Sequence, residues 1–185
     1  MTARATIAWM LVAVAFAAVA RSGQAGMRLA ILAPDGIGSV HFGLTKPQAM
    51  ARLSALFGAP TARGINTGCG PRYTEVEWGD LVAEFRSSTF SGYRYITGGY
   101  PITTSGSPRE PSPPKTPSPA LATARGISLG STLARLRRAY TGLRSIGTDR
   151  WRSPSGLVFV DNAEHDPEPS TSRLVEIRIG TCGDF

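Results

Sequence analysis

The clearest periodic pattern in the chain lies between Val40 and Gly58, in the stretch VHFGLTKPQAMARLSALFG. Apolar residues recur there at helical spacing and form one stripe. Thr45 followed three residues later by Gln48 is a capping box, and Pro47 falls in the first turn, where its missing N–H would have no helical partner. Gly58 suits the left-handed position after the last turn. The pattern predicts a helix that begins after Thr45 and ends before Gly58.

A shorter copy of this pattern spans residues 127–142, in ISLGSTLARLRRAYTG. Gly130 corresponds to Gly43, and either Ser131 or Ser128 can cap the helix that follows. Apolar residues again recur at helical spacing, and a glycine again follows the last of them. The copy predicts a second helix, about one turn shorter than the first.

Alternating sequences after each helix predict antiparallel strands. YTEVEWGDLVAEF alternates on both sides of Gly79 and Asp80, which form a two-residue hairpin turn with glycine first. Further strands are predicted in residues 92–100, 156–161 and 173–180. A helix followed by antiparallel strands, twice over, is the α+β pattern. We expect two tandem units that form one shared or continuous sheet, with the helices packed on one face.

Composition divides the chain into four segments. Residues 27–102 form the first α+β unit and residues 123–185 the second. Residues 103–122 are rich in proline, which is typical of an extended linker; a proline-motif docking site is the alternative. Residues 1–20 contain a positive charge and then an apolar run, which predicts a signal peptide cut after residue 20 or 25. The alternative is an uncleaved anchor, although the run is shorter than the about 20 residues that span a bilayer.

Cleavage of a signal peptide makes the protein secreted or extracytoplasmic, in a compartment where cysteines pair. The chain has two cysteines, Cys69 and Cys182. We expect them to form a disulfide bond that closes a long loop. The alternative is a metal site with His41 and His165 as further ligands, but neither histidine lies near a cysteine at metal-binding spacing. We predict no metal, no cofactor and no stable membrane insertion after cleavage.

The formal net charge is +7, and removal of residues 1–20 lowers it by one. Nucleic-acid-binding proteins gather basic residues beside exposed aromatic residues, whereas most arginines here are scattered, so we expect no nucleic-acid partner. The charge indicates either a solvated basic face or weak binding to anionic cell-wall polymers. The arginines that do cluster lie on the second helix and just after it: Arg135, Arg137, Arg138, Arg144, Arg150 and Arg152.

The stretch VHFGLTKPQAMARL resembles the opening of the repeat unit in the secreted β-lactamase inhibitor protein family, where an apolar-x-apolar-Gly-Met-Thr segment leads into a capped helix. The same unit occurs singly in a small lipoprotein of the outer-membrane barrel-assembly machine. The resemblance covers residues 40–85 and, more weakly, 126–182, and it implies tandem units with one curved sheet. Leu44 replaces the usual Met. Each inhibitor unit closes its own disulfide, whereas a Cys69–Cys182 bond would tie the two units together.

The stretch VDNAEHDPEPS holds the densest group of polar side chains. A carboxylate beside a histidine can orient it as a general base, and carboxylates can bind calcium. The alternatives are a solvated acidic loop and a contact with a partner. Because no local motif places a nucleophile, and neither G-x-S-x-G nor H-E-x-x-H occurs, we predict no catalytic residue. The residues of this group are Asp161, Glu164, His165, Asp166 and Glu168.

Aromatic residues are the second group of candidates for partner binding. Tyr93 and Tyr95 share one face of their strand, opposite Ile96. If Ile96 faces the core, the tyrosines lie on the open face of the sheet, where exposed aromatic rows serve as recognition surfaces. The alternative is that the tyrosines cover the helices instead. Tyr100 and Trp151 complete this group.

These patterns favour an exported, non-catalytic, inhibitor-like protein that binds an extracellular or envelope protein. One alternative is an exported hydrolase or metal-dependent enzyme centred on the His165 loop, and another is a basic structural protein of the cell envelope. Each unit alone is too small to bury a large core. We therefore expect one core shared by both units, with Trp78 beneath the helix that carries Leu53 and Phe57.

Overall fold

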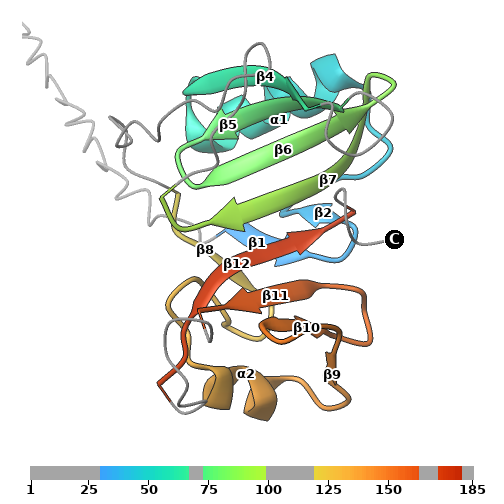
Figure 1. Ribbon diagram of the computed structural model, residues 1–185. Helices are drawn as coiled ribbons and strands as arrows, with labels where there is room; N and C mark the ends of the chain where they lie inside the picture. Colours follow the sequence, from blue (N-terminus) through green and yellow to red (C-terminus); the bar gives the residue numbers. More distant parts are fainter. Residues whose placement is uncertain (1–29, 67–72, 99–118, 163–170, 181–185) are drawn as a thin grey trace, which may run out of the picture.

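The computed structural model describes residues 30–66, 73–98, 119–162 and 171–180, which form two β-sheets and two helices (Figure 1). The strands of the large sheet are β4 (Ala62–Asn66), β5 (Tyr73–Trp78), β6 (Leu81–Arg86), β7 (Thr89–Ile96), β9 (Arg144–Ser145), β10 (Arg150–Arg152), β11 (Val158–Asp161) and β12 (Leu174–Ile179). Those of the small sheet are β1 (Ala30–Ala33), β2 (Gly36–Ile37), β3 (Val40–His41) and β8 (Leu121–Thr123). The order is β4-β5-β6-β7-β12-β11-β10-β9 in the large sheet and β3-β2-β1-β8 in the small one.

The predicted fold class, α+β with helices packed on one face, is wrong, because the described residues are mostly β. Among them only two helices occur, α1 (Lys46–Phe57) and α2 (Leu133–Ala139). Strands are predicted only after each helix. The residues before each helix instead supply the four strands of the small sheet, and Leu32, Ile37 and Val40 of these strands lie in the core. Strands of two to four residues are too short to show alternation in a sequence.

Helix α1 begins and ends where the sequence predicts. The Gln48 side chain accepts a hydrogen bond from the backbone N–H of Thr45 at 3.1 Å, and the capping box is complete. Gly58, with a φ of 84°, ends the helix in a conformation that residues with a Cβ rarely adopt. Ala49 and Leu53 of the predicted apolar stripe are fully buried, whereas Leu56 at its end is 49% exposed.

Helix α2 is capped by Thr132 rather than by Ser131 or Ser128. The Thr132 hydroxyl oxygen accepts a hydrogen bond from the backbone N–H of Arg135 at 3.2 Å. Ser131 instead accepts a bond from the backbone N–H of Ser128 at 3.1 Å and so shapes the turn before the helix. Helix α2 has seven residues where α1 has twelve. The second helix is therefore more than one turn shorter than the first.

The two units repeat the same backbone contacts. In the first unit the N–H of Gly43 donates to the carbonyl of Phe90 at 2.9 Å, and in the second the N–H of Gly130 donates to the carbonyl of Leu174 at 2.8 Å. In each case the strand residue donates back to the residue after the glycine. A β-bulge also interrupts both the β6–β7 and the β11–β12 pairing. The repeat in the sequence is therefore a repeat of structure as well.

The large sheet is symmetric about its centre. Strands β7 and β12, the last of each unit, pair antiparallel, while β4 and β9 form the two edges (Figure 1). In the central pair Arg94 lies opposite Arg178. Arg94 lies four positions after Phe90, and Arg178 lies four positions after Leu174. Phe90 and Leu174 are the strand residues that bond to the turn before each helix. Since the two arginines occupy equivalent positions, an approximate two-fold axis passes between them.

The small sheet joins the beginnings of the two units. Strands β1 and β8 pair in parallel, with Ala30 opposite Leu121 and Ile31 opposite Ala122. The last two residues of the predicted proline-rich linker thus lie in a strand, whereas residues 103–118 lie outside the described residues. The division into a signal peptide, two units and a linker otherwise stays a prediction.

Both units contribute to one hydrophobic core, as predicted, and Trp78 lies in it. Only 2% of Trp78 is exposed, and its indole N–H donates to the carbonyl of Gly58, at the end of α1, at 3.0 Å. Leu53 of α1 is fully buried in the same cluster. The cluster also contains Leu136 of α2 and Phe159 of β11, from the second unit.

The other face of the large sheet carries a buried group of charges. Arg94 forms one ion pair with Glu75 and another with Glu84, the latter at 2.8 Å. The two glutamates are 1% exposed and the arginine 7%. The side-chain amide of Asn66 also donates to Glu75 at 2.9 Å. One arginine therefore compensates two carboxylates that have been removed from water.

Candidate functional site

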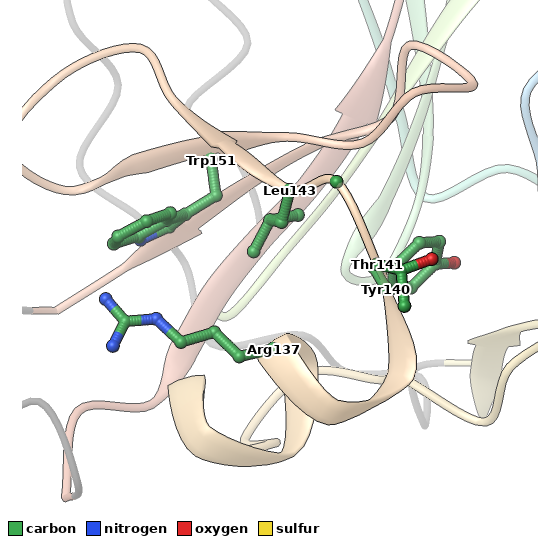
Figure 2. A pocket seen from close by; sticks show the side chains of 6 residues that line it. Arg137, Tyr140, Thr141, Leu143 and Trp151 are labelled. Carbon is green, nitrogen blue, oxygen red and sulfur yellow. The ribbon is translucent and has the colours of Figure 1, made fainter.

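A pocket lies in the second unit, between the end of α2 and the middle of β10 (Figure 2). It has a volume of about 430 Å³ and opens to the surface. Arg137 reaches from α2 toward the ring of Trp151 on β10, and the Leu143 side chain points into the space between them. The lining consists of Arg137, Tyr140, Thr141, Gly142, Leu143 and Trp151.

The shortness of α2 accounts for this pocket. In the first unit the end of α1 covers β5, as the hydrogen bond from Trp78 to Gly58 shows, and Val76 of β5 is fully buried. Trp151 holds the equivalent position on β10. Val76 lies opposite Ala83 of β6 and Trp151 opposite Phe159 of β11. Ala83 and Phe159 each lie one residue before the residue at which the register shifts. In the second unit no further helical turn covers that position, and Trp151 is only partly buried.

Asp161 fixes the orientation of the Trp151 ring. The indole N–H of Trp151 donates to Oδ2 of Asp161 at 2.9 Å. Asp161 lies on β11, beside β10, and is 3% exposed. Because the carboxylate is buried behind the ring, it cannot contact a partner directly, although the sequence suggested such a contact. Its contribution to the site is to hold the indole in place.

Arg137 contacts the same ring. Its Cζ lies 4.6 Å from the centre of the Trp151 ring, and its side chain is exposed. A guanidinium carries five N–H donors, more than contact with one ring can occupy. No carboxylate of the described part of the chain forms an ion pair with Arg137. The arginine therefore presents oriented donors at the mouth of the pocket.

Tyr140 and the turn that follows it form a rigid floor. Tyr140 packs on Phe159 with ring centres 5.2 Å apart, and the guanidinium of Arg125 lies 5.1 Å from the Tyr140 ring. Arg125 also donates to the carbonyl of Ala139, in the last turn of α2, at 2.6 Å. Gly142 has a φ of 76°, which lets the chain turn sharply from the helix toward β9.

Basic charge gathers in the segment that forms the pocket. Residues 133–152, which contain α2, β9 and β10, hold six arginines and one acidic residue, Asp149. Asp149 forms an ion pair with Arg150 at 3.4 Å. The pocket thus lies in a segment dominated by positive charge. Its exposed arginines close to the pocket in sequence are Arg135, Arg137, Arg138, Arg144 and Arg150.

The expectation that Tyr93 and Tyr95 lie on an open face of the sheet is wrong. They are 0% and 6% exposed, and both belong to the core. Their hydroxyls donate to the carbonyls of Ala33 and Pro119, each at 3.0 Å. Burial raises the pKa of both phenols above the ordinary value. The expectation fails because Ile96 lies on the opposite face, on the side of the buried charges.

Most of the other predicted site residues cannot be placed. Among the predicted partner-binding residues that the structure describes, Trp151 lines the pocket. The sequence pattern placed Arg137 in a basic cluster but did not indicate that it forms a pocket with Tyr140 and Leu143, although the early end of the second helix was a signal that could have done so. Seven residues lie outside the described ranges, so their roles stay predictions: Cys69, Tyr100, Glu164, His165, Asp166, Glu168 and Cys182.

No three His, Cys, Asp or Glu side chains of the described residues come together as a possible metal site. Neither α1 nor α2, the helices of this part of the chain, is long and apolar enough to cross a membrane. Comparison of the chain with family models, with curated proteins and with solved structures gave no match. The interpretation of the pocket therefore rests on its own geometry.

Proposed function

We propose that this chain is an exported, non-catalytic protein that binds another protein through the pocket between Arg137 and Trp151. One observation carries the proposal: a tryptophan, a tyrosine and an arginine line one opening. These three residue types are the ones most enriched among the hot spots of protein interfaces. The hydrogen bond to Asp161 and the cation–π contact already hold the ring and the guanidinium in place. Little side-chain freedom is therefore lost when a partner binds.

The chemistry of the lining suits recognition better than catalysis. Its side chains offer a guanidinium, a phenol, one threonine hydroxyl and apolar surface. Nucleophilic catalysis needs a base within hydrogen-bond reach of the nucleophile. The lining residues supply no carboxylate or imidazole, and the nearby carboxylate of Asp161 is bound to the Trp151 indole.

Two features of the sequence support the exported, binding role. The apolar run in residues 1–20 is typical of a signal peptide. The stretch from Val40 resembles the unit of a secreted inhibitor family whose members act by binding a protein. Since one fold can serve many functions, we do not extend the proposal to any particular target of that family.

The test uses three versions of the full chain as bait. The proteins that each version retains from the medium and envelope extract of the producing cells are compared. The versions are the wild type, Trp151→Ala and Arg138→Ala. Arg138 is exposed on the same helix turn as Arg137 but does not line the pocket. We expect the wild type and Arg138→Ala to retain the same protein and Trp151→Ala to lose it. Circular dichroism confirms that each variant is folded.

Each retained protein is then purified, and its affinity for the three versions is measured by titration calorimetry. Loss of a central hot spot weakens binding by about 2 kcal/mol or more, which is about thirtyfold. A purified protein that binds wild type and Trp151→Ala equally would place the interaction elsewhere. A chain that retains no protein, or that turns over a substrate in the same extract, would overturn the proposal.

A further inference from the structure

The chemistry of the pocket also indicates what kind of partner it takes. We propose that the partner presents an acidic segment, in which one carboxylate binds the guanidinium edge of Arg137 and a neighbouring apolar side chain packs on Trp151 and Leu143. This inference rests on the proposed function and specifies the partner of that same site.

The carboxylate is inferred from the state of Arg137. Cζ of Arg137 lies 4.6 Å from the centre of the Trp151 ring, and this cation–π contact leaves N–H groups of the exposed guanidinium for a ligand. A planar fork of donors matches a carboxylate, which can accept two parallel hydrogen bonds. Arg94 illustrates the difference, because it already has Glu75 and Glu84 as ion-pair partners. Within the described residues Arg137 has no such partner.

The apolar side chain is inferred from the opposite wall. Trp151 and Leu143 are only partly buried, although both pack against the hydrophobic core. Their remaining apolar surface faces a space of about 430 Å³, which is large enough for a side chain. Covering this surface removes it from water, which favours the complex. A ligand with charge alone would leave that surface exposed.

The surroundings of the pocket favour a segment with more than one acidic residue. Residues 133–152, which form the helix and strands around the pocket, carry six arginines and one acidic residue. Of these arginines, Arg135, Arg138, Arg144 and Arg150 are exposed in addition to Arg137. Such a surface attracts negative partners and repels positive ones.

The probe for this inference is a random dodecapeptide display library, selected on the immobilised full chain. The selection is repeated on Arg137→Gln, and peptides that bind both are removed. We expect the remaining peptides to be enriched in Asp or Glu next to Leu, Phe or Trp. A synthetic consensus peptide is then compared with two altered versions. One has every acidic residue changed to its amide, and the other has the apolar residue changed to Ser.

Matched variants assign the contact to one arginine. Arg137→Gln and Arg138→Gln each remove one positive charge from the last turn of α2, but only Arg137 lines the pocket. We expect Arg137→Gln to weaken the consensus peptide about tenfold or more, and Arg138→Gln less than about threefold. In NMR spectra, the indole N–H signal of Trp151 should shift on peptide binding, while that of buried Trp78 should not.

Several results would overturn the inference. They are an amide version of the consensus peptide that binds as tightly as the acidic one, equal losses from Arg137→Gln and Arg138→Gln, or no peptide enrichment. Inorganic polyphosphate serves as the test for an anionic polymer. Tighter binding of polyphosphate than of the peptide, unaffected by Trp151→Ala, would make the basic surface a polymer-binding one. If a captured protein needs Trp151 while acidity has no effect, the proposed function stands and this inference fails.

Discussion

Truncation of Trp78 tests whether the end of α1 and the large sheet form one cooperative core. The indole is 2% exposed, lies on β5 and donates to the carbonyl of Gly58 at the end of the helix. Trp78→Ala removes the whole ring from the core. Trp78→Phe keeps an aromatic ring but removes the N–H and part of the volume.

The expected magnitude follows from burial rather than from the hydrogen bond. Removing a fully buried large aromatic side chain costs about 3–5 kcal/mol of unfolding free energy. Gly58 is exposed, so water can replace the lost indole donor and the hydrogen bond adds little. Trp78→Phe should therefore cost about 1–2 kcal/mol, mostly through lost volume. Leu56→Ala is the control, because Leu56 on the same helix is 49% exposed, and it should cost less than about 0.5 kcal/mol.

The assay is urea denaturation followed by circular dichroism, with linear extrapolation to water. A loss of 3–5 kcal/mol is a large part of the about 5–15 kcal/mol that stabilises a typical domain. It lowers the melting temperature of a chain of this length by about 6–20 °C. A loss below about 1 kcal/mol from Trp78→Ala would show that the indole does not anchor the end of α1 to the sheet. Two separate transitions in the wild type would show that the two units do not share one core.

Three further outcomes are expected. Arg94→Leu should cost about 3–5 kcal/mol, because it leaves Glu75 and Glu84 buried without their ion pair; adding Glu75→Gln and Glu84→Gln should recover much of this loss in urea titrations, and no recovery would contradict the assigned pairing. The pKa of Tyr93 is raised by burial above its ordinary 10.0, so its neutral form stabilises the fold fully below pH 10 and this contribution is lost as the pH rises further. By pH 11 the loss is about 1.4 kcal/mol; the stability gap between wild type and Tyr93→Phe should shrink accordingly, and a constant gap would refute the assignment. Protease cleavage in the proline-rich linker should leave the halves together in size-exclusion chromatography, even after reduction, and separate elution of two folded halves would disprove the shared core.

Local chemistry allowed part of the fold to be predicted. The capping box of Thr45 and Gln48 and the glycine after the last turn define α1, and all of these signals lie within the helix itself. Gly79 and Asp80 likewise connect β5 and β6 as a two-residue turn, with Trp78 opposite Leu81. In both cases the residues that decide the structure are neighbours in the sequence.

Features that depend on distant residues could not be predicted in this way. Alternation shows that Tyr93 and Arg94 lie on opposite faces of β7, but it does not show which face is buried. That depends on Glu75 and Glu84, from two other strands, which allow a charged arginine to be buried. The candidate site has the same origin, because Arg137 and Trp151 meet only when α2 packs over β10.

The two-fold arrangement of the large sheet resembles a symmetric homodimer joined into a single chain. A homodimer must carry every substitution twice, at both equivalent positions. Joining the two units in one chain removes that constraint, so the halves can differ. In the described residues, the first half has the longer helix and a fully buried Val76 on β5. The second half has the shorter helix, a partly buried Trp151 and a cluster of arginines in residues 133–152. One copy can thus supply stability while the other diverges toward recognition.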